Sequence, residues 1–345
     1  MAITITMLGT SNTGKTCYLF GTADQMVSGR NGFNFVCTDL DDAYDLQEGW
    51  ERILEGQWPL GSNDHRDYEF NVLLNGRKIE VFKWQDYRGH ILDRDDPTDF
   101  QAFMSRCRVS DALLVCIPSE VLRDGISNDP SKQRNASKIY RRYTNLLMQV
   151  LSEKNVPVAL VITKGDQIKT KDELKRGISD LQARFSGVLF DRGLNRCAMI
   201  TRVFIGKFRE DEMAQGTRFS EALIAPKNIH IPILFPIYWA LSSQLAACES
   251  DIASLRRDKN QFIQNANQAR NQSFLSKLWN GDDSAYYDSQ AKDTEQRIQE
   301  VIQTIDDLKR SLAAIWKEFE ATSVIFDNGK QICGSEEYAR KEKKS

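Results

Sequence analysis

The stretch that decides the fold is Gly9-Thr10-Ser11-Asn12-Thr13-Gly14-Lys15-Thr16, which directly follows the apolar run Ile3–Leu8. It matches the pattern G-x-x-x-x-G-K-[ST], with β-forming residues before it and a helix-capable segment, residues 17–25, after it. In such loops the glycines let backbone N–H groups turn toward phosphate oxygens at the positive end of the helix. The sequence therefore predicts a phosphate-binding loop between a strand and a helix.

The loop and the first helical positions supply the candidate ligands of a nucleotide. Lys15 is expected to bridge the β- and γ-phosphates, a catalytic role, and the Thr16 hydroxyl oxygen is expected to bind Mg²⁺. The predicted nucleotide-contacting residues of this region are Gly9, Ser11, Asn12, Thr13, Gly14, Lys15, Thr16 and Cys17.

Composition limits the class of protein. The 345 residues, 41% of them hydrophobic, suffice for one large or two modest domains with a buried core. The net charge of -2 gives no global basic field, so nucleic acid is not a predicted partner. Seven scattered cysteines without a C-x-x-C pair and only three histidines favour reduced thiols over a disulfide or zinc framework.

The sequence predicts a cytoplasmic protein that does not enter a membrane. Residues 1–8 lack the basic start of a signal peptide. The longest apolar stretch, residues 229–241, contains Pro232 and Pro236 and is shorter than the roughly 20 residues that a membrane-spanning helix needs.

Strands and helices alternate over most of the chain. Near-continuous apolar runs at 111–117, 156–163 and 197–205 are separated by helical patterns at 140–151 and 171–185, with a polar loop before residue 138. This order predicts an α/β fold with a doubly wound, mostly parallel sheet that is covered on both faces. Ligands of such sheets bind at the carboxyl ends of the strands.

A second motif follows a predicted β-hairpin. Residues 68–74 and 78–84 alternate in polarity around Asn75-Gly76, a strong two-residue turn signal. The second strand leads into Asp86-Tyr87-Arg88-Gly89, a D-x-x-G motif. The Asp86 carboxylate is expected to hold Mg²⁺ through a water molecule, and the Gly89 N–H is expected to reach the γ-phosphate.

A third motif selects the base. Thr163-Lys164-Gly165-Asp166 fits [NT]-K-x-D at the end of a strand. Asp166 is expected to accept hydrogen bonds from guanine N1–H and N2–H, a donor pair that adenine lacks, and Lys164 is expected to lie along the base plane. The predicted ligands are therefore GTP and GDP, with Mg²⁺.

The three motifs, in this order and each at a strand end, resemble those of the TRAFAC-class P-loop GTPases, which include Ras-like and translation-factor-related proteins. The resemblance covers residues 1–244 and implies GTP hydrolysis. Within this class, Trp58-Pro59-x-Gly61-Ser62 before the hairpin is similar to the bacterial double-GTPase-like families linked to conflict and antiviral defence.

The resemblance implies further site residues. The switch-one hydroxyl that binds Mg²⁺ would be Ser62, with Thr38 as the competitor. His90 would orient the attacking water, or would be an ordinary surface-loop histidine. Arg88 would act as an arginine finger in cis, or would face solvent or a partner.

Two other positions carry alternatives. Asn12 stands where potassium-activated GTPases have an asparagine that helps to hold K⁺, although a loop asparagine also suits an unusual backbone angle. Gly206 and Lys207 are the best match to the base-stacking loop, but they depart from its usual S-A-K pattern.

The C-terminal third differs from the rest of the chain in composition and in the spacing of its apolar residues. Ile298, Ile305, Leu312 and Phe319 are seven residues apart, and apolar residues at 301, 308 and 315 interleave with them. A weaker seam begins at Leu245. We predict an antiparallel helical hairpin, a coiled coil, over 245–321, after a GTPase domain (1–244) and before a partly disordered tail (322–345). Within the tail, residues 323–333 are expected to fold back around Asn328-Gly329, and residues 336–345 to be disordered.

The hairpin is the predicted interaction element. Apolar residues gather near its turn, and they either close the hairpin, bind a protein partner or contact a membrane; the acidic residues around them disfavour the membrane. These residues are Phe274, Leu275, Leu278, Trp279, Tyr286 and Tyr287. The heptads could also pair two chains by self-association.

The expected function is a GTP-controlled molecular switch that hydrolyses GTP slowly without a partner. Two alternatives stand beside it: a scaffold that binds GTP and scarcely hydrolyses it, and a dynamin-like self-assembling GTPase. The link to defence rests on the resemblance alone.

Overall fold

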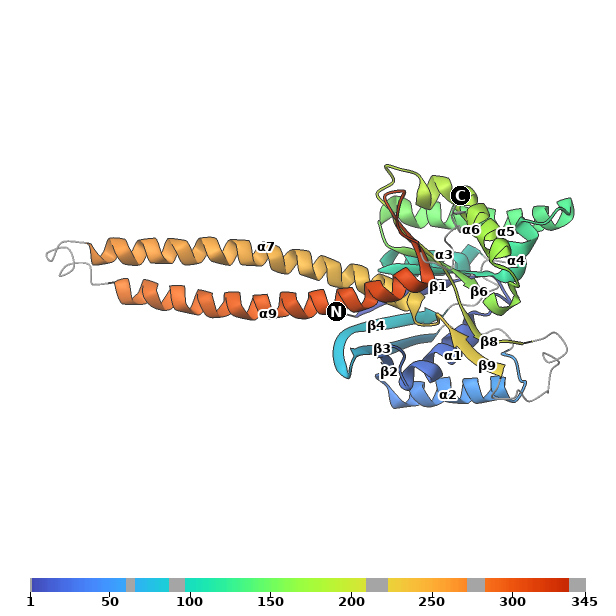
Figure 1. Cartoon of the computed structure of the whole chain (residues 1–345), viewed down its shortest axis with the longest axis horizontal. Coiled ribbons are helices and arrows are strands. Elements are labelled where there is room, and N and C mark those ends of the chain that lie inside the picture. Colours follow the sequence, from blue (N-terminus) through green and yellow to red (C-terminus); the bar gives the residue numbers. More distant parts are fainter. Residues whose placement is uncertain (1, 60–65, 87–96, 209–222, 272–282, 335–345) are drawn as a thin grey trace, which may run out of the picture. The chain divides into compact units, whose positions relative to one another are not determined.

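A computed structural model describes residues 2–59, 66–86, 97–208, 223–271 and 283–334. It is an α/β protein built on a large mixed sheet (Figure 1). By its internal contacts the chain divides into two compact units, one of residues 1–237 and 315–345 and one of residues 238–314. These limits differ from the predicted boundaries at 244 and 321. Each limit between the units falls within a long helix and not at a helix end.

The main sheet has nine strands in the order β11-β10-β7-β6-β5-β1-β4-β3-β2. Five central strands, β4, β1, β5, β6 and β7, are parallel to their neighbours in that set, and the flanking pairs are antiparallel. The strands are β1 (Ile3–Leu8), β2 (Phe33–Cys37), β3 (Arg66–Leu74), β4 (Arg77–Asp86), β5 (Ala112–Pro118), β6 (Val158–Thr163), β7 (Cys197–Arg202), β10 (Ser323–Asp327) and β11 (Lys330–Gly334).

Helices cover the sheet. Every residue of β5 and β6 is buried, as expected for strands with both faces covered. The helices are α1 (Lys15–Val27), α2 (Leu40–Leu54), α3 (Pro97–Val109), α4 (Ser119–Gly125), α5 (Pro130–Glu153), α6 (Lys171–Arg184), α7 (Ile231–Arg270) and α9 (Ser284–Thr322).

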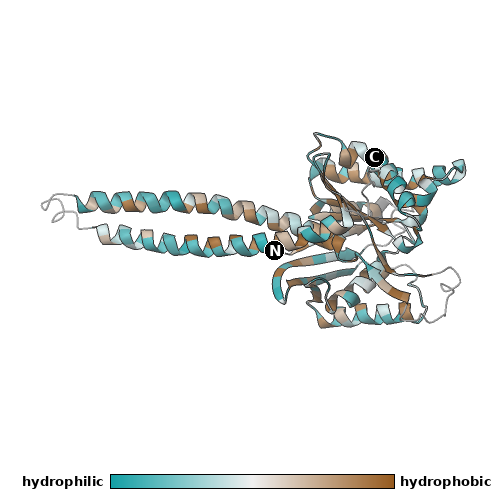
Figure 2. Ribbon diagram, viewed as in Figure 1, coloured by the Kyte–Doolittle hydropathy of each residue, from teal (hydrophilic) through white to brown (hydrophobic). Residues whose placement is uncertain are grey.

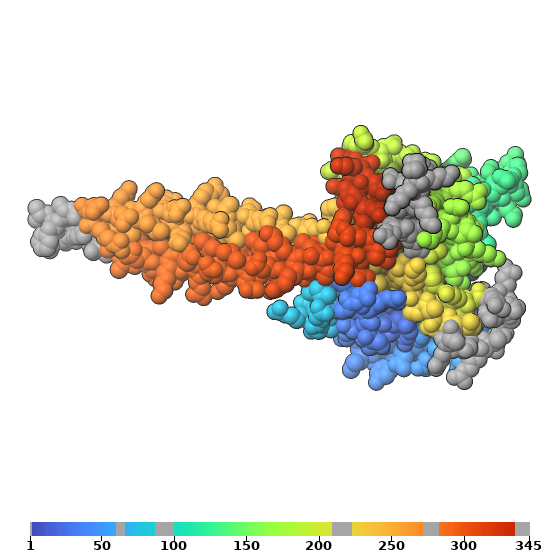
Figure 3. Space-filling model, viewed as in Figure 1, coloured from blue at the N-terminus to red at the C-terminus, as the bar shows by residue number. Residues whose placement is uncertain are grey.

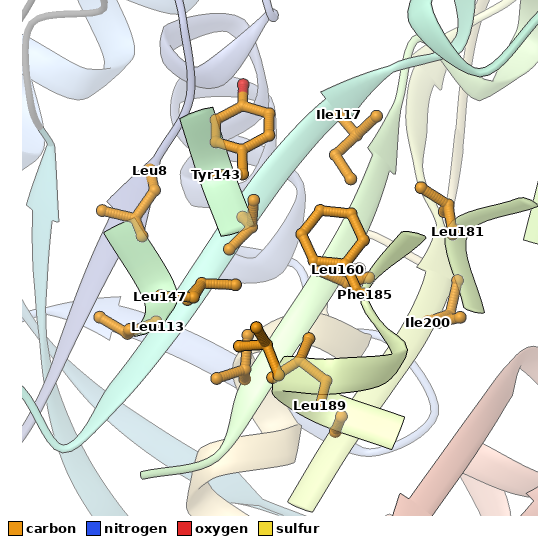
Figure 4. Packing of buried hydrophobic residues seen from close by; sticks show 14 of the residues in the cluster. Leu8, Leu113, Ile117, Tyr143, Leu147, Leu160, Leu181, Phe185, Leu189 and Ile200 are labelled. Atoms are coloured by element: carbon orange, nitrogen blue, oxygen red, sulfur yellow. The ribbon is translucent and has the colours of Figure 1, made fainter. Parts of the chain in front are cut away.

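A large apolar core lies between the parallel strands and the helices α3, α5 and α6. Leu113 of β5 and Leu160 of β6 lie on the sheet side of this core, opposite Tyr143 and Leu147 of α5, with Phe185 packed beside them (Figure 4). The core orders the strands whose carboxyl ends bear the sequence motifs.

Local sequence explains where several elements begin and turn. Asn75 and Gly76 both have positive φ, 50° and 78°, so the predicted hairpin between β3 and β4 is confirmed. The predicted polar loop before residue 138 is wrong, because α5 begins at Pro130, with Asp129 as its N-cap. The first turns of α5 are solvent-exposed and polar, so apolar periodicity did not reveal them.

The predicted strand over 197–205 is two strands. β7 ends at Arg202, and β8 (Phe204–Gly206) pairs with β9 (Ile224–Lys227) in a separate two-stranded sheet. Val203 lies at the break, where its N–H donates to Ile162 O and its carbonyl accepts the Gly165 N–H. These bonds satisfy the backbone of Val203 at the end of β6 and let the chain turn away from the main sheet.

The predicted C-terminal tail contains two strands of the main sheet. β10 pairs antiparallel with β7, and β11 pairs with β10 around Asn328-Gly329. Asn328 Oδ1 accepts the N–H groups of Gly193 and Asn195, which holds this turn to a neighbouring loop. Residues 335–345 lie outside the described part.

The second unit, residues 238–314, contains the part of α7 from Tyr238 onward and the part of α9 up to Ala314, and we call it the helical arm. Ion pairs join Lys309 to Glu249 (3.4 Å) and Lys259 to Glu295 (2.5 Å). The paired residue of α9 has a lower number when its partner in α7 has a higher one, so the two helices run antiparallel and lie side by side (Figures 1 and 3). Ile298, Ile305, Leu308 and Leu312 are among the buried apolar residues of α9.

Among the described helices, α7 contains one stretch that is long and apolar enough to cross a membrane by length and composition alone. Of that stretch, 44% is buried inside the protein. Ile233, Leu234, Phe235 and Ile237 belong to the buried core of the first unit, and Figure 2 shows the same concentration of apolar residues there. A core helix passes the same test, so the stretch is weak evidence for a membrane span.

Candidate functional site

The strand order brings the three sequence motifs to one edge of the sheet. β1 lies between β4 and β5, and β6 follows β5, all in parallel. Met7 pairs with Asp86, and Leu8 pairs with Val115, so β1 and β4 end together, while β5 and its partner β6 continue three residues further on the same side of the sheet. The loop after β1, the end of β4 and the loop after β6 therefore meet there.

The loop between β1 and α1 folds around the ammonium group of Lys15. This side chain is only 6% exposed, and its Nζ donates to Gly9 O (2.8 Å), Thr10 O (3.1 Å) and Thr13 Oγ1 (3.3 Å). Gly14 precedes the helix with a φ of 80°, a conformation that favours glycine. The arrangement presents a buried positive charge and the N-terminus of a 13-residue helix, a suitable site for phosphate.

Neighbouring elements anchor this loop. The Thr163 hydroxyl, on a residue 2% exposed, donates to Thr13 O at 2.6 Å. The Thr10 N–H donates to Tyr143 Oη at 3.0 Å, and that hydroxyl donates to Cys116 O at 3.2 Å. The sequence analysis did not predict this role of Tyr143, because an aromatic residue at helical spacing is typical of a core residue.

Asp86 is a buried carboxylate with an unused oxygen. The residue is 5% exposed, and its Oδ1 has no hydrogen-bond partner among the residues that the structure describes, which resume at Pro97 after Asp86. Burial raises the pKa of Asp86 to about 6, against the opposing effects of the Lys15 ammonium and a hydrogen bond with the Thr16 hydroxyl. An orphaned buried oxygen beside a threonine hydroxyl fits the donor set that a magnesium ion with a bound nucleotide needs.

Cys17, the next helical position, is half-buried. Burial raises the pKa of its thiol to about 12; the charge of Lys164 lowers this pKa and that of Asp86 raises it. The thiol therefore stays protonated at neutral pH. Its pKa is influenced by charges from both the D-x-x-G and the T-K-x-D motif.

The loop after β6 lies against the phosphate loop. Lys164 has a left-handed backbone with a φ of 49°, and its Nζ pairs with Glu120 Oε1 at 3.0 Å. A Cβ atom on Gly14 would lie 3.8 Å from Lys164 Cγ, so the aliphatic part of Lys164 passes beside the phosphate loop. Ser119 Oγ supports this loop by donating to Lys164 O at 2.8 Å.

Asp166 is half-buried at the same loop. Its Oδ2 accepts the N–H of Phe208 at 3.4 Å. Burial raises the pKa of Asp166, and the hydrogen bond from Phe208 opposes that rise. Of the predicted base-stacking pair, Gly206 ends β8 and Lys207 donates its N–H to Leu223 O; the contact with Asp166 comes from the next residue, Phe208, which sequence reasoning missed.

Several predicted site residues cannot be placed. Ser62, Arg88, Gly89 and His90 lie outside the described residues, as do residues 274–279 near the turn of the arm. Thr38, the alternative to Ser62, donates its hydroxyl to Glu69 O at 3.2 Å.

Ser11 and Asn12 are both exposed in the phosphate loop. Asn12 has a left-handed φ of 61°, which suits the conformational interpretation of this asparagine. Its predicted role in binding K⁺ stays a prediction.

Comparison of the chain with protein-family models and with curated proteins finds no match. The assignment of the site therefore depends on its geometry.

Proposed function

We propose that this protein is a P-loop GTPase of the TRAFAC class, a molecular switch that binds and hydrolyses GTP. One observation supports this above all: the buried Lys15, the buried Asp86 with its unpartnered oxygen, and the Thr163–Asp166 loop meet at one sheet edge. Three motifs that converge in the order needed for phosphates, metal and base make a coherent nucleotide site.

Each residue has a distinct part in the proposed reaction. The Lys15 ammonium exchanges the Gly9 and Thr10 carbonyls for β- and γ-phosphate oxygens, whose charge it neutralises as water attacks. Bound Mg²⁺ neutralises further phosphate charge, and the Thr16 hydroxyl and the Asp86 carboxylate would hold it. Asp166 accepts the two guanine N–H groups, and His90 is the predicted residue that orients the water.

The helical arm is the proposed output element, an antiparallel helical hairpin that binds a protein partner or a second chain. The ion pairs between α7 and α9 and their buried apolar seam support a stable two-helix unit. A place in bacterial defence is part of this proposal only through the family resemblance.

The test is a side-by-side calorimetric titration with GTP and with ATP, each with Mg²⁺, on the wild type and on Asp166→Asn. We expect tight GTP binding, a strong preference over ATP, and loss of that preference in the variant. Equal binding of both nucleotides would refute guanine selection, and binding of neither would refute the nucleotide site. Phosphate release by His90→Ala then separates a hydrolytic switch from a GTP-binding scaffold, since only the switch loses turnover while keeping GTP affinity.

A further inference from the structure

An apolar cluster lies beside the loop that contains Asp166 and joins three parts of the candidate site. Trp50 and Ile53 of α2 form its buried centre. Partly buried apolar side chains surround them: Cys17, Phe20, Leu54, Trp58, Ile205, Phe208, Leu223 and Ile224. The cluster therefore connects the helix after the phosphate loop, the segment after α2 and the strand pair β8–β9.

Phe208 is held on two sides within this cluster. Its ring occupies the space over Gly206, where a Cβ atom would lie 2.5 Å from Phe208 Cζ. Its ring also meets Trp58 edge to face, with the centroids 5.9 Å apart and the planes at 90°. A ring fixed in this way holds its own backbone in place, and that backbone provides the N–H bonded to Asp166 Oδ2.

The orientation of the Asp166 carboxylate matters for reading a base. Guanine presents N1–H and N2–H in one plane, so both carboxylate oxygens must lie near that plane. The Phe208 N–H restrains one of these oxygens. If the restraint is lost, the carboxylate can rotate and lose one charge-assisted hydrogen bond to the base, which is worth about tenfold or more in affinity.

We infer that Phe208 and Trp58 are positioning residues that set guanine selectivity by holding Asp166 in its base-reading orientation, an inference that rests on the proposed function. Trp58 acts through the Phe208 ring, and Phe208 acts through its N–H. Both residues lie outside the phosphate loop, so their effect is on selection of the base and not on binding of the phosphates.

The experiment measures the dissociation constants of GTP, ATP and inorganic tripolyphosphate, each with Mg²⁺, for the wild type, Phe208→Ala and Trp58→Ala. We expect both variants to lose about tenfold of the GTP-over-ATP preference, with tripolyphosphate affinity unchanged within about twofold. Phe208→Tyr keeps the ring and is expected to keep the preference. Phe20→Ala is the matched control, because Phe20 is an aromatic residue of the same cluster that lies on α1 and is not part of the Trp58–Phe208 ring pair.

Three results would overturn the inference. The first is a GTP preference that survives in both alanine variants, and the second is an equal loss of preference in Phe20→Ala, which would reveal a general packing effect. The third is a wild type without GTP preference, which also refutes the proposed function and is recognised before any variant is measured. If Phe208→Ala does not fold, Phe208→Leu, which removes the aromatic edge but fills the space, is measured against the same expectations.

Discussion

Replacing Asp86 with asparagine should stabilise the nucleotide-free protein at alkaline pH while weakening its Mg²⁺-dependent nucleotide binding. The carboxylate is buried, and one of its oxygens has no hydrogen-bond partner within the described part of the chain. Burial raises the pKa of Asp86 from 3.8 to about 6 in the folded protein. A folded-state pKa above the unfolded value means that the folded state binds this proton more tightly, so its contribution to stability is lost as pH rises from about 4 through about 6.

The magnitude follows from the shift in pKa. A change from 3.8 to about 6 corresponds to about 3 kcal/mol of destabilisation by the ionised carboxylate above pH 7, as an upper limit. Asparagine resembles the protonated acid in shape and charge. Asp86→Asn should therefore raise the free energy of unfolding by up to about 3 kcal/mol at pH 8 and change it little at pH 4.

The assay is urea-induced unfolding at pH values from 4 to 8, with EDTA and without nucleotide. The comparison of interest is the difference in free energy of unfolding between Asp86→Asn and the wild type at each pH. Asp251→Asn, at an exposed position of α7, serves as the control and should show no such pH-dependent difference. Adding GDP and Mg²⁺ should reverse the order, because only the wild type keeps the carboxylate expected to help hold the metal.

Two results would refute this reasoning. One is a variant less stable than the wild type at pH 8, which would mean that the carboxylate is well solvated or paired in the folded protein. The other is a stability difference that does not change between pH 4 and pH 8. Unchanged nucleotide affinity in the variant would separately contradict the metal-binding role.

Three further predictions concern buried polar groups. Lys15→Ala should abolish nucleotide binding in calorimetry, since it removes the buried ammonium; retained tight binding would exclude the phosphate-loop assignment. Thr163→Val should lower the free energy of unfolding by about 1–3 kcal/mol and weaken GTP binding, because the carbonyl of Thr13 loses its 2.6 Å bond; unfolding and binding curves identical to the wild type would contradict the anchor. Glu318→Ala should destabilise the protein by about 1–3 kcal/mol in urea unfolding, because the His230 ring, 2% exposed, loses its 3.1 Å hydrogen bond with the Glu318 carboxylate; a change below about 0.5 kcal/mol would contradict this bond.

The Glu318 prediction has its own pH dependence. Burial acts to raise the pKa of Glu318, but hydrogen bonds from His230 and Asn31 outweigh it and hold the pKa below its ordinary value of 4.5. The stabilisation is therefore present above the unfolded pKa and is lost as pH falls through the lower folded value. The stability difference between wild type and Glu318→Ala should shrink below pH 4.5, which urea unfolding extended to pH values below 4 measures.

Much of the central fold could be predicted because its signals are local. The strand before the phosphate loop, the turn at Asn75-Gly76 and the buried runs of β5 and β6 each depend on a few neighbouring residues. The candidate site was predictable for the same reason. Each motif is contiguous and follows a strand, and parallel strands end at the same edge of a sheet.

Other features are decided by residues far apart in the chain. The turn at Asn328-Gly329 is a local signal, but whether residues 323–334 join the main sheet depends on pairing with β7, more than a hundred residues earlier. The start of α5 at Pro130 depends on a cap and polar turns that have no apolar period.

The sequence by itself determined the α/β class and the strands that lead into the G-x-x-x-x-G-K-T, D-x-x-G and T-K-x-D motifs, because these follow from short-range chemistry and periodicity. Only the tertiary structure decided what holds the site in shape. Tyr143 anchors Thr10 across 133 positions, and Phe208 reaches Asp166 across 42. A hydrogen bond between distant residues has no signature in either local sequence, since it exists only once the sheet has brought its loops together.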